Sequence, residues 1–166
     1  MIALESKNLL IVEANETDIN KIMEIEYDKA NRDYTWLSSY EDHLAQINDQ
    51  DTLLFLVKEK ASNEVIGYLI IDLEADSLKI NRVAITKKNQ GYGTELFLII
   101  FDYCFKQQNK AKLYLEVYQD NERAIKFYQK LGMHQDKTIE DFYVTDRGSV
   151  NQLIFSILKN EYQQLF

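Results

Sequence analysis

The sequence predicts an α+β fold: one domain over residues 1–166, with a mixed sheet of six to seven strands and about four helices. Three β-type runs follow one another between residues 52 and 85 with no helical pattern between them, unlike the alternating order of a doubly wound sheet. A polar loop with two glycines then joins the last run to a strongly apolar helix. Because the chain holds only five glycines and no proline, this pair marks special backbone.

The chain begins with a strand and a helix. Residues 8–14 form an apolar run that predicts the first strand. Apolar residues then recur at helical spacing over residues 16–30. Either Asn15 or Thr17 can cap this helix, since both residue types favour the cap position.

A second helix is predicted over residues 38–47. Ser38 and Glu41 have the spacing of a capping box at its start. The preceding residues 31–37 hold a tyrosine and the only tryptophan. These aromatic side chains either line a binding cleft or pack beneath the helices.

Three strands follow, over residues 52–58, 65–73 and 78–85. In the third, the apolar alternation changes parity near Asn81 and Arg82. A β-bulge at this point would add one residue, bend the strand and leave backbone groups unpaired. A strand buried on both faces would explain the same pattern, because it need not alternate.

The second half of the chain alternates helices and strands. The predicted elements are a helix over 94–107, a strand over 112–118, a helix over 121–131 that ends at Gly132, and strands over 141–146 and 150–159. Together with the first half, they complete the predicted α+β order.

The composition excludes several classes of partner. The net charge is −8, from 27 acidic and 19 basic residues, which argues against nucleic acid because a nucleic-acid groove needs a basic face. The acidity suits either a cationic substrate or simple solubility. No apolar run is long enough to span a bilayer, and the first residues lack a signal-peptide pattern. We therefore expect no membrane partner and a cytoplasmic location.

The cysteine and the two histidines predict no special chemistry. Cys104 is the only cysteine, so no internal disulfide forms, and its apolar helix predicts a buried thiol. His43 and His134 are isolated in the sequence, which predicts no metal site.

The glycine loop is the first candidate site. A strand that runs through a glycine loop into a helix points unpaired N–H groups outward, at the positive end of the helix dipole. Such a junction binds phosphate or pyrophosphate, here through the backbone N–H groups of residues 88–94. Taken alone, Gly91 and Gly93 fit an ordinary strand-to-helix turn better, and the loop lacks the further residues of a dinucleotide or Walker fingerprint.

Two motifs resemble the GCN5-related N-acetyltransferase (GNAT) family. Lys88-Asn89-Gln90-Gly91-Tyr92-Gly93 is similar to the family's acyl-CoA loop, with Lys88 in place of the usual Gln or Arg. The run from Asn121 to Met133 is similar to its second block, an Asn followed on one helix by Ala, Tyr and Gly. The final strand resembles the branch that includes bacterial ribosomal-protein-alanine N-acetyltransferases. The resemblance implies the GNAT fold, with the sheet splayed at a bulged fourth strand.

This resemblance implies an acetyl-CoA-dependent N-acetyltransferase that moves an acetyl group directly to a primary amine. The acceptor is a small amine, a polyamine or a protein N-terminus. The residues expected to bind acetyl-CoA are Val83, Ile85, Lys88, Asn89, Gln90, Gly91, Tyr92, Gly93, Thr94, Asn121, Arg123 and Tyr128. Asn121 also fits a helix cap, as does Asp120, and Arg123 and Lys126 fit either the 3′-phosphate or solvent.

Two catalytic roles follow from the resemblance. Tyr128 is the expected general acid that protonates the leaving thiolate, although its spacing alone fits a core tyrosine. Glu116 is the expected base, directly or through water, and otherwise a solvated strand carboxylate. Acceptor contacts are expected from residues 31–37, the second helix and residues 140–147. The alternatives are a non-catalytic acyl-CoA-binding regulatory module and a scaffold for a partner protein. Tyr114, Tyr118 and Tyr143 are surplus to these roles and would fit a homodimer face.

Overall fold

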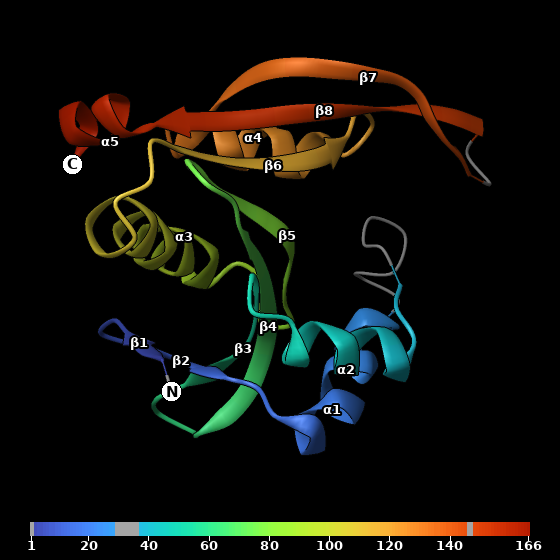
Figure 1. Cartoon of the computed structure of the whole chain (residues 1–166), viewed down its shortest axis with the longest axis vertical. Coiled ribbons are helices and arrows are strands. Elements are labelled where there is room, and N and C mark those ends of the chain that lie inside the picture. Colours follow the sequence, from blue (N-terminus) through green and yellow to red (C-terminus); the bar gives the residue numbers. More distant parts are fainter. Residues whose placement is uncertain (1, 29–36, 146–147) are drawn as a thin grey trace.

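The computed structural model describes residues 2–28, 37–145 and 148–166 and shows a mixed α+β fold (Figure 1). Its sheet has eight strands in the order β1-β2-β3-β4-β5-β6-β8-β7. The strands are β1 (Ala3–Glu5), β2 (Leu9–Glu13), β3 (Thr52–Glu59), β4 (Glu64–Leu73), β5 (Ser77–Ile85), β6 (Lys112–Tyr118), β7 (His134–Thr145) and β8 (Gly148–Leu158). All neighbours are antiparallel except β5 and β6, which are parallel. The predicted α+β class and mixed sheet are confirmed.

Helices lie on both faces of the sheet. They are α1 (Ile19–Glu26) after a 3₁₀ turn η1 (Glu16–Asp18), α2 (Tyr40–Asn48), α3 (Tyr92–Asp102) continued by a π-helical turn η2 (Tyr103–Gln107), α4 (Glu122–Lys130) and α5 (Lys159–Leu165). Successive β3 residues face opposite ways. Leu54 and Leu56 pack with Ile22 of α1, whereas Phe55 and Val57 belong to the larger cluster that includes α3.

The bulge predicted in the third of the central strands is present. Ile70 of β4 pairs with Arg82 and Ile71 pairs with Ile80, so Asn81 is the additional residue of β5. The bulge resets the alternation, and residues on both sides of it, such as Leu78 and Ile85, pack in the same cluster. The parity change is therefore a bulge.

The sheet opens where this bulge lies. Pairing between β5 and β6 ends at Ile80 and Leu115, although both strands continue beyond that point. Figure 1 shows the two strands running in different directions beyond their paired ends. The predicted splay is therefore confirmed. It lies at the strand predicted over residues 78–85, which is the fourth in the prediction and β5 in the structure.

Both early helices differ from their predicted bounds. Asn15 caps the 3₁₀ turn by accepting from the Thr17 N–H at 2.9 Å, and α1 ends at Glu26. Residues 29 and 30 of the predicted helix lie outside the described residues. For α2, the predicted Ser38 cap is wrong. Ser39 caps it, accepting from the Asp42 N–H at 3.2 Å while the Asp42 carboxylate accepts from the Ser39 N–H at 3.0 Å.

Three elements were missed or misplaced. β1 has only three residues, too few to show alternation, and the polar α5 offers no clear apolar stripe. The predicted strand at 141–146 begins earlier, at His134. The first part of β7 is strongly polar, and it forms a strand because β8 supplies its pairing partner along the sheet edge. The end of the helix before Gly132 is confirmed, since that glycine has φ +93°.

Within residues 2–28, 37–145 and 148–166, no helix has the length and apolar character needed to cross a membrane. Cys104 is fully buried, and burial raises the pKa of its thiol to about 12, as expected of a core residue.

Candidate active site

A cavity of about 1340 Å³ occupies the opening between β5 and β6. It extends from the bulge of β5 to the first turns of α3 and α4. Its lining includes nearly all the predicted site residues: Val83, Ile85, Lys88, Asn89, Gly91, Tyr92, Gly93, Thr94, Glu116, Asn121, Arg123 and Tyr128. Gln90 is not among the lining residues. The structure therefore brings together residues that are up to 45 positions apart in the sequence, counted from Val83 to Tyr128.

The glycine loop places the N-terminus of α3 at one end of this cavity. Asn89 and Gly91 both have left-handed backbone, with φ of +60° and +78°. Gly91 is the cap residue of α3, and the Glu95 N–H bonds back to its carbonyl at 3.2 Å. The first N–H groups of this helix, from Tyr92 onward, consequently lack helical acceptors. Such concave backbone at a helix N-terminus binds anions.

Cations gather beside this loop, although the chain is acidic overall. The Arg123 Nη2 donates to the Asn89 side-chain oxygen at 3.2 Å, which joins the start of α4 to the loop. Desolvation and the positive charge of Arg123 lower the pKa of Lys88. Lys87 and Lys126 also line the cavity. A bound anion would relieve the repulsion between Lys88 and Arg123, so the loop has both the backbone and the charge for a phosphate group.

An aromatic cluster joins α3 to α4 beneath the loop. The Phe97 ring centroid lies 5.3 Å from that of Phe127 and 5.5 Å from that of Tyr128. A Cβ atom at Gly93 would lie 3.3 Å from the Phe127 ring, tighter than most contacts of its kind. The second glycine of the loop thus allows α3 and α4 to approach closely, and this packing fixes the position of Tyr128.

Tyr128 combines an apolar setting with an unpaired hydroxyl. Burial raises the pKa of Tyr128 to about 12. Tyr128 is only partly buried and lines the cavity, and among the described residues its hydroxyl has no protein hydrogen-bond partner. The core-tyrosine interpretation required a satisfied hydroxyl, which none of the described residues provides, and the role of Tyr128 as general acid stays a prediction.

Glu116 lies at the other side of the cavity, on β6. Its side chain is 25% exposed, with Lys79 Nζ 3.4 Å from one carboxylate oxygen. The Gln152 Nε2 donates to the other oxygen at 3.4 Å. Lys79 and Gln152 line the cavity as well. Glu116 is therefore held between two polar side chains in the cavity, and is not a freely solvated strand carboxylate.

Asn121 caps α4, which was one of the two roles predicted for it. Its side-chain oxygen accepts from the Ala124 N–H at 3.3 Å. The predicted contact of Asn121 with acetyl-CoA stays a prediction.

Sequence reasoning missed Glu59, at the end of β3. Its nearly buried carboxylate accepts from Lys87 Nζ at 2.8 Å, from the Tyr92 hydroxyl at 2.6 Å and from the Ser62 hydroxyl at 2.7 Å. These hydrogen bonds, with the Lys87 ammonium first, lower the pKa of Glu59 to about 2. Glu59 anchors both the start of the loop and the first residue of α3. Ser62 is near Glu59 in the sequence, but Lys87 and Tyr92 are 28 and 33 residues away. No local pattern therefore predicts that Glu59 anchors the loop.

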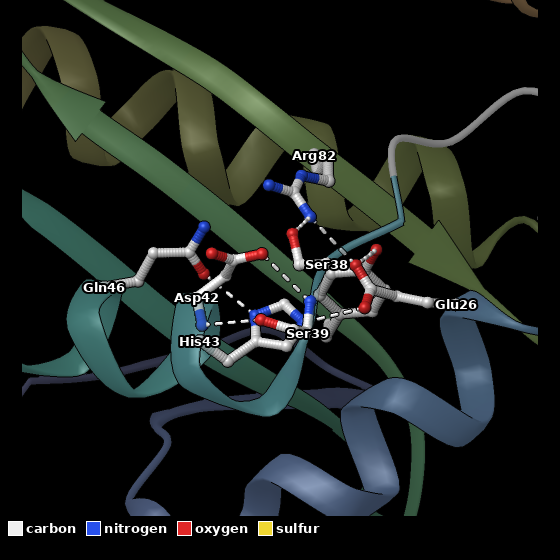
Figure 2. Close-up of polar contacts among 8 residues, drawn as sticks. Glu26, Ser38, Ser39, Asp42, His43, Gln46 and Arg82 are labelled. Atoms are coloured by element: carbon white, nitrogen blue, oxygen red, sulfur yellow. Dashed lines mark hydrogen bonds and ion pairs between the residues drawn. The ribbon is translucent and has the colours of Figure 1, made fainter.

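Both histidines, which are isolated in the sequence, have polar partners in the fold. His43 lies within hydrogen-bond distance of Glu26 and Gln46, all in the first two helices, as Figure 2 shows. His134 lies 3.0 Å from the Glu161 carboxylate. Glu26 follows Ile19 by seven positions and so lies on the buried stripe of α1. This position is the sequence signal for its role, because a charged residue on a buried face needs a partner.

The predicted acceptor region is only partly described. Residues 31–36 lie outside the described residues, as do the side chains in 140–147. Two of the surplus tyrosines are used within the chain. Tyr114 donates to the Glu74 carboxylate at 2.6 Å, and Tyr118 lines the cavity. The homodimer stays a prediction.

Two parallel strands that separate beside a helix N-terminus are the arrangement expected of the acyl-CoA-dependent family that the two sequence motifs resemble. Comparison with known families agrees: residues 19–133 match the model described as "Acetyltransferase (GNAT) family". The chain belongs to this family, and it is an N-acetyltransferase with acetyl-CoA as acetyl donor. The resemblance to the ribosomal-protein-alanine branch stays a prediction.

Solved structures show the same fold. A spermidine N-acetyltransferase from Vibrio cholerae, in complex with CoA and spermine, is 19% identical, with a TM-score of 0.83 over 95% of this chain and 99% of that one. A GCN5-related N-acetyltransferase from Brucella melitensis is 17% identical, with a TM-score of 0.82 over 99% and 81%. A GNAT-family acetyltransferase from Bacillus anthracis is 17% identical, with a TM-score of 0.78 over 96% and 99%.

Proposed function

We propose that this protein transfers the acetyl group of acetyl-CoA directly to a primary amine bound in the cavity between β5 and β6. One observation carries the proposal: a single cavity holds the cationic glycine loop, the unpaired Tyr128 hydroxyl and the Glu116 carboxylate. Direct transfer needs the donor, the amine and the proton-transfer groups in one place.

The loop and β5 would hold acetyl-CoA. The N–H groups of residues 88–94 would bind the pyrophosphate, with the α3 dipole behind them. Arg123 and Lys126 would meet the 3′-phosphate. Beyond Ile80, none of the described strands pairs with the edge of β5 that faces β6. The backbone of Val83 and Ile85 is therefore available to pair with the pantetheine arm, as an added strand would.

The two candidate catalytic groups would move protons at opposite ends of the reaction. Glu116 would accept a proton from the incoming ammonium group, directly or through water. Tyr128 would give its proton to the departing thiolate. A tyrosine whose pKa is raised to about 12 keeps its proton near neutral pH, as a general acid must.

Charge favours a small cationic amine as the acceptor. The chain has a net charge of −8, which attracts amines that are protonated at neutral pH. The Vibrio cholerae structure in complex with spermine is a precedent for a polyamine on this fold. A protein N-terminus is the second candidate. The ribosomal-protein-alanine branch has a Tyr-Tyr-Pro-Thr loop at this place. This chain has Phe142-Tyr143-Val144-Thr145 instead, and the difference counts against a peptide acceptor.

Thiol release tests the proposal. Acetyl-CoA is incubated with the protein and, in separate reactions, with spermidine, spermine, simple monoamines and N-terminal peptides. We expect amine-dependent release of free thiol, greatest with the polyamines, and an acetylated amine of the corresponding mass. Binding of coenzyme A without release by any amine would instead indicate an acyl-CoA-binding module.

A further inference from the structure

A buried polar cluster joins both early helices to the bulged strand (Figure 2). Glu26, in the last turn of α1, is fully buried. One of its carboxylate oxygens lies 2.6 Å from Nε2 of His43, on α2. The other accepts from the Tyr68 hydroxyl of β4 at 2.9 Å and from Nη1 of Arg82, on β5, at 3.0 Å. Four elements therefore meet at one carboxylate.

The same Arg82 nitrogen reaches the start of α2. Arg82 Nη1 also donates to the Ser38 hydroxyl, which is 2% exposed. Ser38 directly precedes Ser39, the residue that caps α2. One guanidinium nitrogen thus holds the end of α1 and the start of α2 together. This bond also explains why Ser38 does not serve as the helix cap.

The paired charges of this cluster favour one arrangement of α1 and α2 relative to β5. Glu26 is paired with two side chains that can be cationic, Arg82 and His43. The other ring nitrogen of His43, Nδ1, lies 2.8 Å from the Gln46 side chain, so both ring nitrogens have a polar partner. A buried charge that loses its partner is costly, so helices held in this way resist displacement.

Arg82 connects this cluster to the reaction cavity. It directly follows Asn81, the additional residue of the bulge, and it lines the cavity. The first turn of α2 is therefore fixed relative to the point where β5 and β6 separate. Among the described residues, Arg82 lines the cavity whereas α2 itself does not, so Arg82 transmits the position of α2 to the cavity.

We propose that Arg82 is a positioning residue for the amine acceptor, which it serves by locking α1 and α2 onto the bulge through Glu26 and Ser38. This inference rests on the proposed function and on the expectation, drawn from the family resemblance, that the second helix contributes to the acceptor site. Arg82 acts through the helices and not on the reacting atoms. It should therefore govern the acceptor and leave acetyl-CoA binding alone.

Arg82→Lys tests this, with Arg123→Lys as its matched control at the opposite end of the cavity. Lysine keeps the charge but not the fork that reaches two acceptors. We expect Arg82→Lys to raise the acceptor KM roughly 10-fold, with the acetyl-CoA KM changed less than twofold. Arg123→Lys should show the reverse. An unchanged acceptor KM in Arg82→Lys, or an equal rise of both constants, would overturn the proposal.

Hydrogen exchange supplies a readout that does not need turnover. Amides of residues 40–48 should exchange faster in Arg82→Lys than in Arg123→Lys at equal thermal stability. Equal exchange in the two variants would contradict the positioning role. If Arg82→Lys does not fold, Ser38→Ala removes one bond of the cluster and should act in the same direction, by about threefold. A wild-type protein that acetylates no amine would refute the proposed function, while the exchange comparison would still decide the role of Arg82.

Discussion

Replacing Tyr128 with phenylalanine removes only the hydroxyl that we assign to the leaving thiolate. The ring contacts with Phe97, Phe127 and Phe155 remain, because they involve the aromatic ring alone. Within the described residues the hydroxyl has no hydrogen-bond partner, so its loss leaves no polar group unsatisfied. We therefore expect the free energy of unfolding to change by less than about 0.5 kcal/mol.

The effect on the reaction should be large by comparison. Removal of a positioned general acid costs roughly 10² to 10³ in rate, or about 2.7 to 4 kcal/mol of barrier. We expect kcat to fall by that factor while the dissociation constant of coenzyme A stays within about twofold, because the phosphate contacts are made by other residues. A thiol-reactive chromophore measures kcat, and calorimetry measures binding.

Tyr103→Phe is the matched control for this variant. Tyr103 is buried outside the cavity, and its hydroxyl accepts from Gln108 Nε2 at 3.1 Å. That variant should lose some stability and keep its kcat. Turnover of Tyr128→Phe within about threefold of wild type would refute the assignment, as would a loss of turnover that tracks a loss of coenzyme A binding.

Three further variants test the loop, the base and the anchor. Gly91→Ala forces a side chain into left-handed backbone, which costs about 1 to 2 kcal/mol. Calorimetry should therefore show that coenzyme A binds roughly 10-fold more weakly to this variant. Undiminished affinity would argue against the loop as the phosphate site. Glu116→Gln should lower kcat and alter the pH–rate profile, whereas an unaltered profile would assign the base to water alone. The carboxylate of Glu59 has its pKa lowered to about 2, so the stability it provides is present above its usual value of 4.5 and is lost as pH falls toward 2. Denaturant midpoints should therefore fall less steeply over that range in Glu59→Gln than in wild type, and equal slopes would contradict this role.

The features that depend on neighbouring residues could be predicted from the sequence. The bulge near Asn81 appeared as a change of parity within one strand, and the loop appeared as two glycines between a strand and a helix. Both are local, so the residues that cause them stand together in the chain. The positions of Glu116 and Tyr128 in one cavity required the family resemblance, because no local rule relates β6 to α4.

Elements whose stability comes from their neighbours were harder to predict. β7 begins with polar residues and exists because β8 pairs with it. The start of α2 was misplaced by one residue, since Ser38 and Ser39 each precede an acidic residue by three positions. Only the contact of Ser38 with Arg82, 44 residues away, distinguishes the two serines.

Buried charges were the least predictable feature. Glu26, His43 and Arg82 lie on separate elements, and Glu59 is joined to residues that follow it by 28 and 33 positions. The helical stripe places Glu26 on a buried face, but the partner of each charge is known only when the fold is known. The two clusters nevertheless support the helices on one side of the cavity and the phosphate loop on the other.

An NMR titration of backbone amides tests most directly whether the N–H groups of residues 88–94 hold the diphosphate of coenzyme A. Coenzyme A should produce the largest ¹H–¹⁵N shifts at residues 89–94, and pantetheine, which lacks the phosphates, should leave these amides unchanged while it shifts those of Val83 and Ile85. Loop amides that do not respond to coenzyme A, or that respond equally to pantetheine, would contradict the proposed binding site.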